Sequence, residues 1–183
     1  MIDHNDNEVV VGVDNGTSGA LVAVSGYDGS LISKLKMPTV SRKISTVKTP
    51  IKEPDVGEIA EWIRSLNSPT RVFLEEAPIH AKSARSLRSQ CICQGMLFGM
   101  LLGMASKDVE AHSVGVREWQ NHMLGKGIPR GHTKRFALEL AQSIDPAEDW
   151  LATPRSTTPH DGIVDAFLIA QFARIKLGLG LTR

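Results

Sequence analysis

The chain has 183 residues, of which 42% are hydrophobic and 22% are charged, and its formal net charge is +1. These values are ordinary for one globular domain, and they exclude a disordered, collagen-like or coiled-coil chain. Residues 1–8 are polar and acidic, which predicts a flexible tail and not a signal peptide. With two cysteines separated by one residue, a disulfide framework is excluded and a reducing, cytoplasmic compartment is expected.

The small net charge hides an uneven distribution of charged residues. Residues 29–52, 77–107 and 117–135 together hold 15 of the 21 basic residues and one of the 20 acidic residues. A basic surface around acidic centres is typical of proteins that bind phosphates and hold metal ions. Chance clustering on solvated loops is the alternative interpretation.

Hydrophobic periodicity and turn residues predict the elements in chain order. Strands are expected at 8–14, 20–25, 31–37, 71–75 and 109–112, and helices at 55–66, 83–105, 116–124, 133–143 and 161–176. The basic segment 38–54 lacks periodicity and predicts a loop, and Thr158 is the expected N-cap of the last helix. Three meander strands followed by alternating helices and strands predict an α/β or α+β layered domain.

Four carboxylates occupy positions where packing alone does not require them. Asp14 and Glu75 each end an apolar strand, and Asp161 and Asp165 lie one turn apart at the start of the last helix. Acids that converge at strand ends need a positive partner, and a pair of Mg²⁺ ions supplies one. Three of the four also have a structural interpretation: a turn cap for Asp14, an ion pair with a lysine for Glu75, and a favourable helix dipole for Asp161.

Three motifs in order resemble the RuvC-like Holliday junction resolvases, and their phage and organellar branches more than the bacterial proteins. The motifs are VGVDNGTSGAL at 11–21, FLEEAP at 73–78 and HDGIVDAFLIA at 160–170, and the resemblance runs over nearly the whole chain. It implies one RNase H-like domain over residues 1–183, with a three-stranded antiparallel meander and parallel strands in a mixed sheet flanked by helices. It also implies a homodimer that nicks four-way DNA junctions with two Mg²⁺ ions per active site, for which Mn²⁺ can substitute. Neither a membrane nor a small-molecule cofactor is expected, and a cytoplasm, an organelle or a phage-infected cell fits this activity.

The resemblance assigns roles to individual residues. It places catalytic, metal-binding acids at Asp14, Glu75, Asp161 and Asp165 and a catalytic lysine at Lys134. Glu76 stands where relatives often have glutamine, so Glu75 is the acid that we expect in the site. The bacterial pattern has its other late acid at the position of Gly162, so Asp161 departs from it, and the sequence leaves open whether Asp161 or His160 completes the metal site. Expected DNA contacts are Lys82, Arg85, Arg88, Lys126, Arg130, Lys134 and Arg135, and helix 83–105 is a candidate for the dimer interface.

Two other classes of protein remain as alternatives. Residues 12–18 are also similar to the first phosphate motif of sugar kinases and related ATPases, but those proteins close two such domains over a nucleotide, and no second phosphate loop is found here. A DNA-binding module of the same fold without catalysis would not require the acids at the strand ends.

Overall fold

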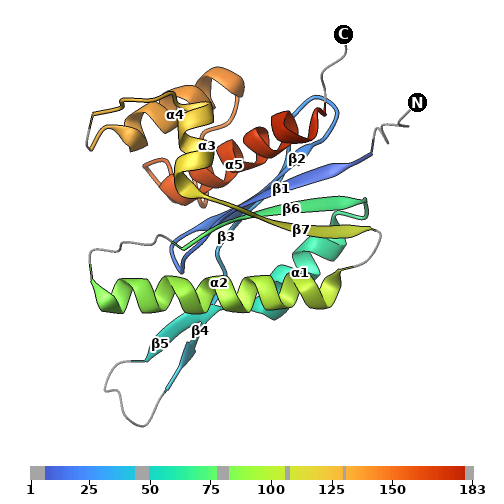
Figure 1. Cartoon of the computed structure of the whole chain (residues 1–183), viewed down its shortest axis with the longest axis vertical. Coiled ribbons are helices and arrows are strands. Elements are labelled where there is room, and N and C mark those ends of the chain that lie inside the picture. The colour runs from blue at the N-terminus through green and yellow to red at the C-terminus, as the bar shows by residue number, and fades with distance from the viewer. Residues whose placement is uncertain (1–6, 44–49, 78–82, 106–107, 130, 180–183) are drawn as a thin grey trace.

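The computed structural model describes residues 7–43, 50–77, 83–105, 108–129 and 131–179 (Figure 1). Its strands are β1 (Val9–Asp14), β2 (Ala20–Ser25), β3 (Leu31–Lys36), β4 (Thr39–Arg42), β5 (Ile51–Pro54), β6 (Thr70–Glu75) and β7 (Val109–Val114). Its helices are α1 (Val56–Ser65), α2 (Ala84–Met104), α3 (Val116–Met123), α4 (Thr133–Ile144) and α5 (Asp161–Leu177). No helix among the described residues is long and apolar enough to cross a membrane.

Five strands form the central sheet in the order β3-β2-β1-β6-β7. The β1–β2 and β2–β3 pairs are antiparallel, whereas β1–β6 and β6–β7 are parallel. This mixed sheet confirms the expected fold class. Because β1 and β6 are parallel neighbours, Asp14 and Glu75 at their carboxyl ends lie at the same edge of the sheet.

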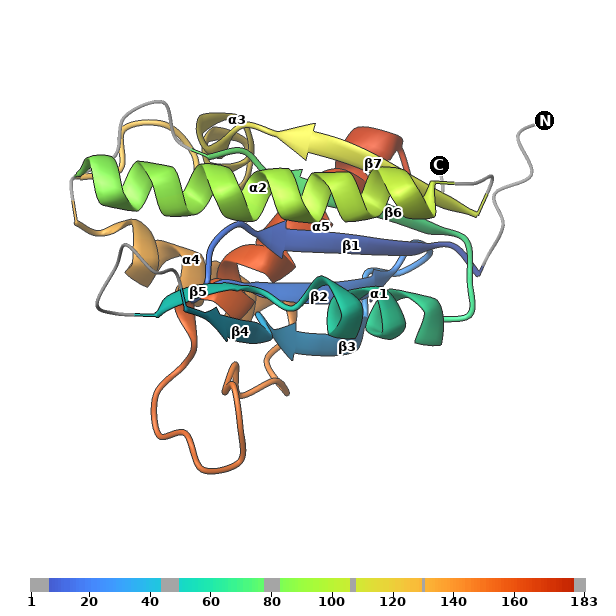
Figure 2. The same ribbon diagram turned by 90° about the horizontal axis from the view of Figure 1, so that it is seen from below.

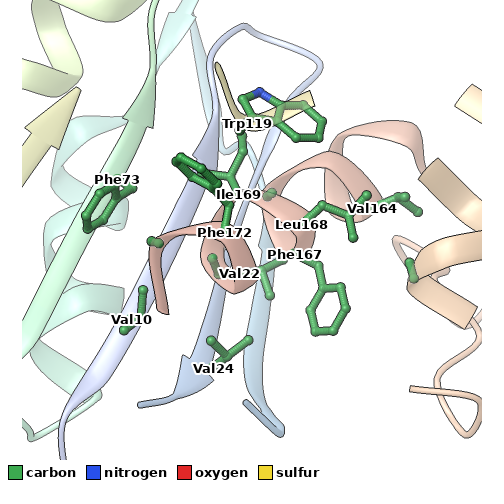
Figure 3. Close-up of a cluster of buried hydrophobic side chains, with 14 of the residues drawn as sticks. Val10, Val22, Val24, Phe73, Trp119, Val164, Phe167, Leu168, Ile169 and Phe172 are labelled. Carbon is green, nitrogen blue, oxygen red and sulfur yellow. The ribbon is translucent and has the colours of Figure 1, made fainter. Parts of the chain in front are cut away.

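Helices cover both faces of the sheet, which explains why β1 and β2 are buried along almost their whole length (Figure 2). Along β1, Val9, Val11 and Val13 face α1 and α2, while Val10 faces α5. The two faces thus carry separate hydrophobic cores. Figure 3 draws part of the core between the sheet and α5, with labels on Val10, Val22, Val24, Phe73, Trp119, Val164, Phe167, Leu168, Ile169 and Phe172.

Two glycines allow α5 to lie directly against the sheet. A Cβ at Gly12 would collide with the backbone of Ala166 and Ala170 in α5. A Cβ at Gly162 would stand 2.8 Å from both Asp14 Oδ2 and Gly19 Cα. The first turn of α5 is therefore held against the end of β1.

Two local predictions were wrong. Segment 38–54 contains an antiparallel pair, β4 and β5, in place of a loop, although residues 44–49 lie outside the described part. The pair is joined by Arg42, whose Nη2 and Nε donate to Glu53 at 2.5 and 2.9 Å, and Glu53 is buried. The N-cap of α5 is His160 and not Thr158, because His160 Nδ1 accepts a hydrogen bond from Ile163 N at 3.3 Å.

Candidate active site

Three half-buried acids meet where β1, β6 and α5 come together. Asp14 and Glu75 share a hydrogen bond, and Asp165, one turn into α5, raises the pKa of Glu75 through its charge. Glu75 follows Asp14 by 61 positions, and Asp165 follows Glu75 by 90. The β1–β6 pairing and the packing of α5 on β1 bring the three residues to one place.

The three acids hold their protons more tightly than ordinary carboxyl groups do. Burial, followed by the charge of Glu75, raises the pKa of Asp14 to about 7. Burial also raises the pKa of Glu75 to about 7, against a hydrogen bond from Trp119 that lowers it. Burial and the charges of Asp14 and Asp161 raise the pKa of Asp165 to about 7. Acids arranged in this way favour binding of a cation that replaces their protons.

A tryptophan of the core also holds one of these acids. Trp119 in α3 is fully buried, and its Nε1 donates to Glu75 Oε1 at 2.8 Å. The neighbouring Glu76 is exposed, so the two glutamates differ in burial. Nothing in the local sequence indicates this hydrogen bond, because the two residues are 44 positions apart.

An exposed ion pair lies beside the buried acids. Lys134, in the first turn of α4, donates through Nζ to Asp161 Oδ2, and both side chains are largely exposed. This bond, with the charges of Asp161, Asp165 and Asp14, raises the pKa of Lys134. Lys134 and Asp161 thus lie close enough to Asp14 and Asp165 for their charges to interact.

The first turn of α5 packs closely against the end of β1 at Gly162. A side chain at 162 would collide with Gly19 and the carboxylate of Asp14, so the first turn of α5 accepts only glycine there. Asp161 precedes it on the exposed side of the turn. His160 Nδ1 is used to cap the helix, and burial together with the charge of Lys36 lowers the pKa of His160.

The donor chemistry of this site fits hard divalent cations. Carboxylate oxygens are the ligands that Mg²⁺ prefers. The charge of Lys134 offsets only part of the rise in pKa that burial causes at Asp14 and Asp165. Within the described residues, no three acidic, histidine or cysteine side chains form a ready-made metal cage. The exposed side chains of Asp161 and Lys134 have room to rearrange beside the inner acids.

The expected DNA contacts are only partly described. Arg88 on α2, Lys126 between α3 and α4, and Arg135 on α4 are exposed, and Arg135 Nε lies 3.5 Å from Glu139 Oε1. Lys82 and Arg130 lie outside the described residues, and Arg85 is described only as part of the backbone of α2.

Solved structures of junction resolvases share this fold. The structure of Thermus thermophilus RuvC in complex with a Holliday junction substrate matches with a TM-score of 0.54 and 17% identity, over 92% of this chain and 96% of that one. A second T. thermophilus RuvC structure matches with a TM-score of 0.52 and 18% identity, over 93% and 97% of the two chains. The yeast mitochondrial Holliday junction resolvase Ydc2 matches with a TM-score of 0.54 and 14% identity, over 92% of this chain and 80% of that one.

These similarities confirm a RuvC-like fold of the RNase H-like type. No family model matches the sequence, and no curated protein is significantly similar to it. The phage or organellar branch stays a prediction.

Proposed function

We propose that this protein is a structure-selective endonuclease that resolves four-way DNA junctions by metal-dependent hydrolysis of phosphodiester bonds. The observation that carries the proposal is the convergence of Asp14, Glu75 and Asp165, each with its pKa raised to about 7, on a fold shared with RuvC. Burying three acids together has no packing value, and it costs free energy unless cations neutralise them.

Each residue of the site has a distinct task in this proposal. Asp14, Glu75, Asp161 and Asp165 would hold two Mg²⁺ or Mn²⁺ ions. Such ions, when bound, lower the pKa of water and stabilise charge on the attacking and leaving oxygens of a phosphodiester. Trp119 keeps Glu75 oriented through its hydrogen bond, and Lys134, at the exposed edge, would contact the scissile phosphate.

The decisive test is single-turnover cleavage of a labelled four-way junction. Mg²⁺ or Mn²⁺ should support paired nicks, Ca²⁺ should support binding alone, and Asp14→Asn should remove cleavage while junction binding persists. A panel of three-way, flap and linear DNAs measures the selectivity. Full cleavage by Asp14→Asn, or in excess chelator, would refute the nuclease and leave the non-catalytic DNA-binding alternative.

A homodimer is part of the proposal, because two symmetric nicks need two sites related by a two-fold axis. The outer face of α2 supports it: a Cβ built at Gly95, Gly99 or Gly103 meets nothing within 4 Å, and Leu102 is 57% exposed. Light scattering should give a dimer for the wild type and a monomer for Leu102→Glu. Ile32→Glu, on the β3 strand and 49% exposed, is the matched control that should remain dimeric.

The DNA partner would lie along the basic residues that flank the acids. Phosphate contacts position DNA without reading its bases, so Arg88→Ala and Lys126→Ala should weaken binding equally for all junction sequences. Each lost contact should reduce the slope of log affinity against log salt by about one unit. Unchanged affinity and slope in both variants would place the DNA on another surface.

A further inference from the structure

A hairpin of two short strands begins at the end of the central sheet that carries the acids. β3 ends at Lys36, and the β1–β2 and β2–β3 pairings place Asp14, Ala20 and Lys36 in one row across the sheet. Two residues after Lys36, the carbonyl oxygen of Pro38 accepts a hydrogen bond from Asp55 N at 2.9 Å, which closes the base of the hairpin formed by β4 and β5. The hairpin therefore starts at the same edge of the sheet as Asp14, and Figure 2 shows β4 and β5 at the end toward which β1 points.

The two faces of this hairpin differ in burial and in charge. On one face Glu53 is buried and accepts hydrogen bonds from Arg42, and β5 packs against α2. Because successive side chains of a strand point to opposite faces, the register partners Ser41 and Lys52 lie on the other face. Both are exposed, and so is Lys43, the residue that follows β4. Among the described residues neither lysine has an ion-pair partner, so the hairpin is held by Arg42 and does not need their charges.

Lys36 connects the hairpin to the acid site. Its side chain is exposed, and its backbone lies two strand spacings, about 10 Å, from that of Asp14. Its charge also reaches the start of α5, because burial, followed by the charge of Lys36, lowers the pKa of His160. From there the four residues of β4 extend about 13 Å at ~3.3 Å per residue. A series of exposed lysines thus begins beside the acids and continues along the hairpin.

The hairpin and α4 lie on opposite sides of the acid site. β5 contacts α2, which covers one face of the sheet, whereas α4 packs on α5 at the other face (Figure 1). A DNA strand with one phosphate at the acids continues from there in two directions. The exposed Lys126 and Arg135 are on the α4 side, so their contacts would hold only one of these directions.

We propose that Lys36, Lys43 and Lys52 bind the phosphates of the DNA arm that leaves the acid site on the side opposite α4. The inference rests on the proposed nuclease function and adds a binding surface to it, since none of the three lysines is among the DNA contacts that the resemblance implies. Exposed lysines without partners attract phosphates and do not read bases. At 3.4 Å per base pair, the distances along the sheet and β4 place these contacts about three to seven base pairs from the cut.

The first experiment measures junction affinity as a function of salt for Lys36→Ala, Lys43→Ala and Lys52→Ala. Each variant should reduce the slope of log affinity against log salt by about 0.9, which is about an eightfold loss of affinity at 0.1 M salt relative to 1 M. Arg64→Ala is the matched control, because Arg64 is exposed in the last turn of α1, which leads to the start of β6 at the other end of the sheet. Its affinity and slope should equal those of the wild type.

The second experiment removes the charge from the DNA instead of the protein. Uncharged methylphosphonate linkages three to seven base pairs from the cut should weaken binding by the wild type. They should weaken binding by the double variant Lys43→Ala/Lys52→Ala much less, since the same contacts are already lost. The same number of linkages near the end of the arm is the control and should leave both affinities unchanged. Thermal unfolding checks each variant, and a glutamine at the same position replaces any alanine that impairs folding.

The outcomes separate this inference from the proposed function. Unchanged affinity and slope in all three lysine variants, with cleavage intact, would overturn the hairpin contact and leave the nuclease in place. Equal losses from the methylphosphonate linkages in the wild type and the double variant would also overturn it, because the lysines would not meet those phosphates. Junctions that are bound through the three lysines but are not cleaved with Mg²⁺ would refute the nuclease alone.

Discussion

The inner and outer parts of the acid site differ in how they are held. Asp14, Glu75 and Asp165 are half-buried, act on one another through their charges, and are fixed by the sheet, by α5 and by Trp119. Asp161 and Lys134 are largely exposed and contact mainly each other. Exposed ion pairs contribute little to stability and rearrange freely, whereas buried like charges stay together only because the fold holds them. The difference indicates an inner group of acids that is fixed by the fold and an outer ion pair that is free to rearrange.

The largest expected effect is that of Glu75→Gln. Loss of one inner carboxylate should lower the single-turnover cleavage rate about a thousandfold, because several kcal/mol of transition-state stabilisation are removed. The adjacent and exposed Glu76 offers a matched control, and Glu76→Gln should cleave at nearly the wild-type rate. Equal losses in the two variants would show that burial does not distinguish the catalytic glutamate.

A smaller loss is expected where the support of the inner group is weakened. Trp119→Phe keeps an aromatic core residue but removes the donor to Glu75 Oε1, which should slow cleavage about 10- to 100-fold. The control is Trp62→Phe, which removes a similar hydrogen bond, from Trp62 Nε1 to Ser33 Oγ at 3.1 Å, outside the site. If the metal concentration for half-maximal activity rises only in Trp119→Phe, the hydrogen bond acts through Glu75.

The outer pair should give a weaker effect that falls on cleavage more than on binding. Lys134→Ala should reduce the cleavage rate about tenfold, the lower range for one group acting on a developing charge. Arg135→Ala, its neighbour on α4, should weaken junction binding without a comparable loss of the cleavage rate. If Lys134→Ala loses binding and cleavage equally, Lys134 is an ordinary phosphate contact.

The smallest effect concerns stability without metal. The inner acids have pKa values raised to about 7, so they bind protons more tightly in the folded state than in the unfolded chain. Their contribution to stability is therefore present at low pH and is lost as pH rises from about 4 through about 7. In chelator, the melting temperature should fall by about 2–4 °C more between pH 5 and pH 8 in the wild type than in Asp14→Asn. Added Mg²⁺ should restore the melting temperature at pH 8. If the melting temperatures of the two proteins depend on pH in the same way, the inner acids do not repel one another as proposed.

Hydrophobic periodicity within single segments was sufficient to predict most elements of this protein. The apolar runs of β1, β2 and β6 and the amphipathic pattern of α1 are local properties, so the strands and the helix appeared at nearly the right residues. The β4–β5 pair was missed because it lies outside the five-stranded sheet, and β4 is largely exposed. Its strands are held together by the contact between Arg42 and Glu53, which segment composition does not reveal.

The candidate site likewise combines features that are local in the sequence with contacts that only the fold creates. The sequence by itself placed Asp14 and Glu75 at strand ends and Asp165 on the last helix, because strand length and helical spacing are local. Only the tertiary structure brought them together, and it showed that Glu75 is half-buried, that Glu76 is exposed, and that position 162 accepts only glycine. The hydrogen bonds from Trp119 to Glu75 and from Asn15 to Gln90 are likewise known only from the tertiary structure. The residues of these pairs are 44 and 75 positions apart, and a local pattern carries no information about such contacts.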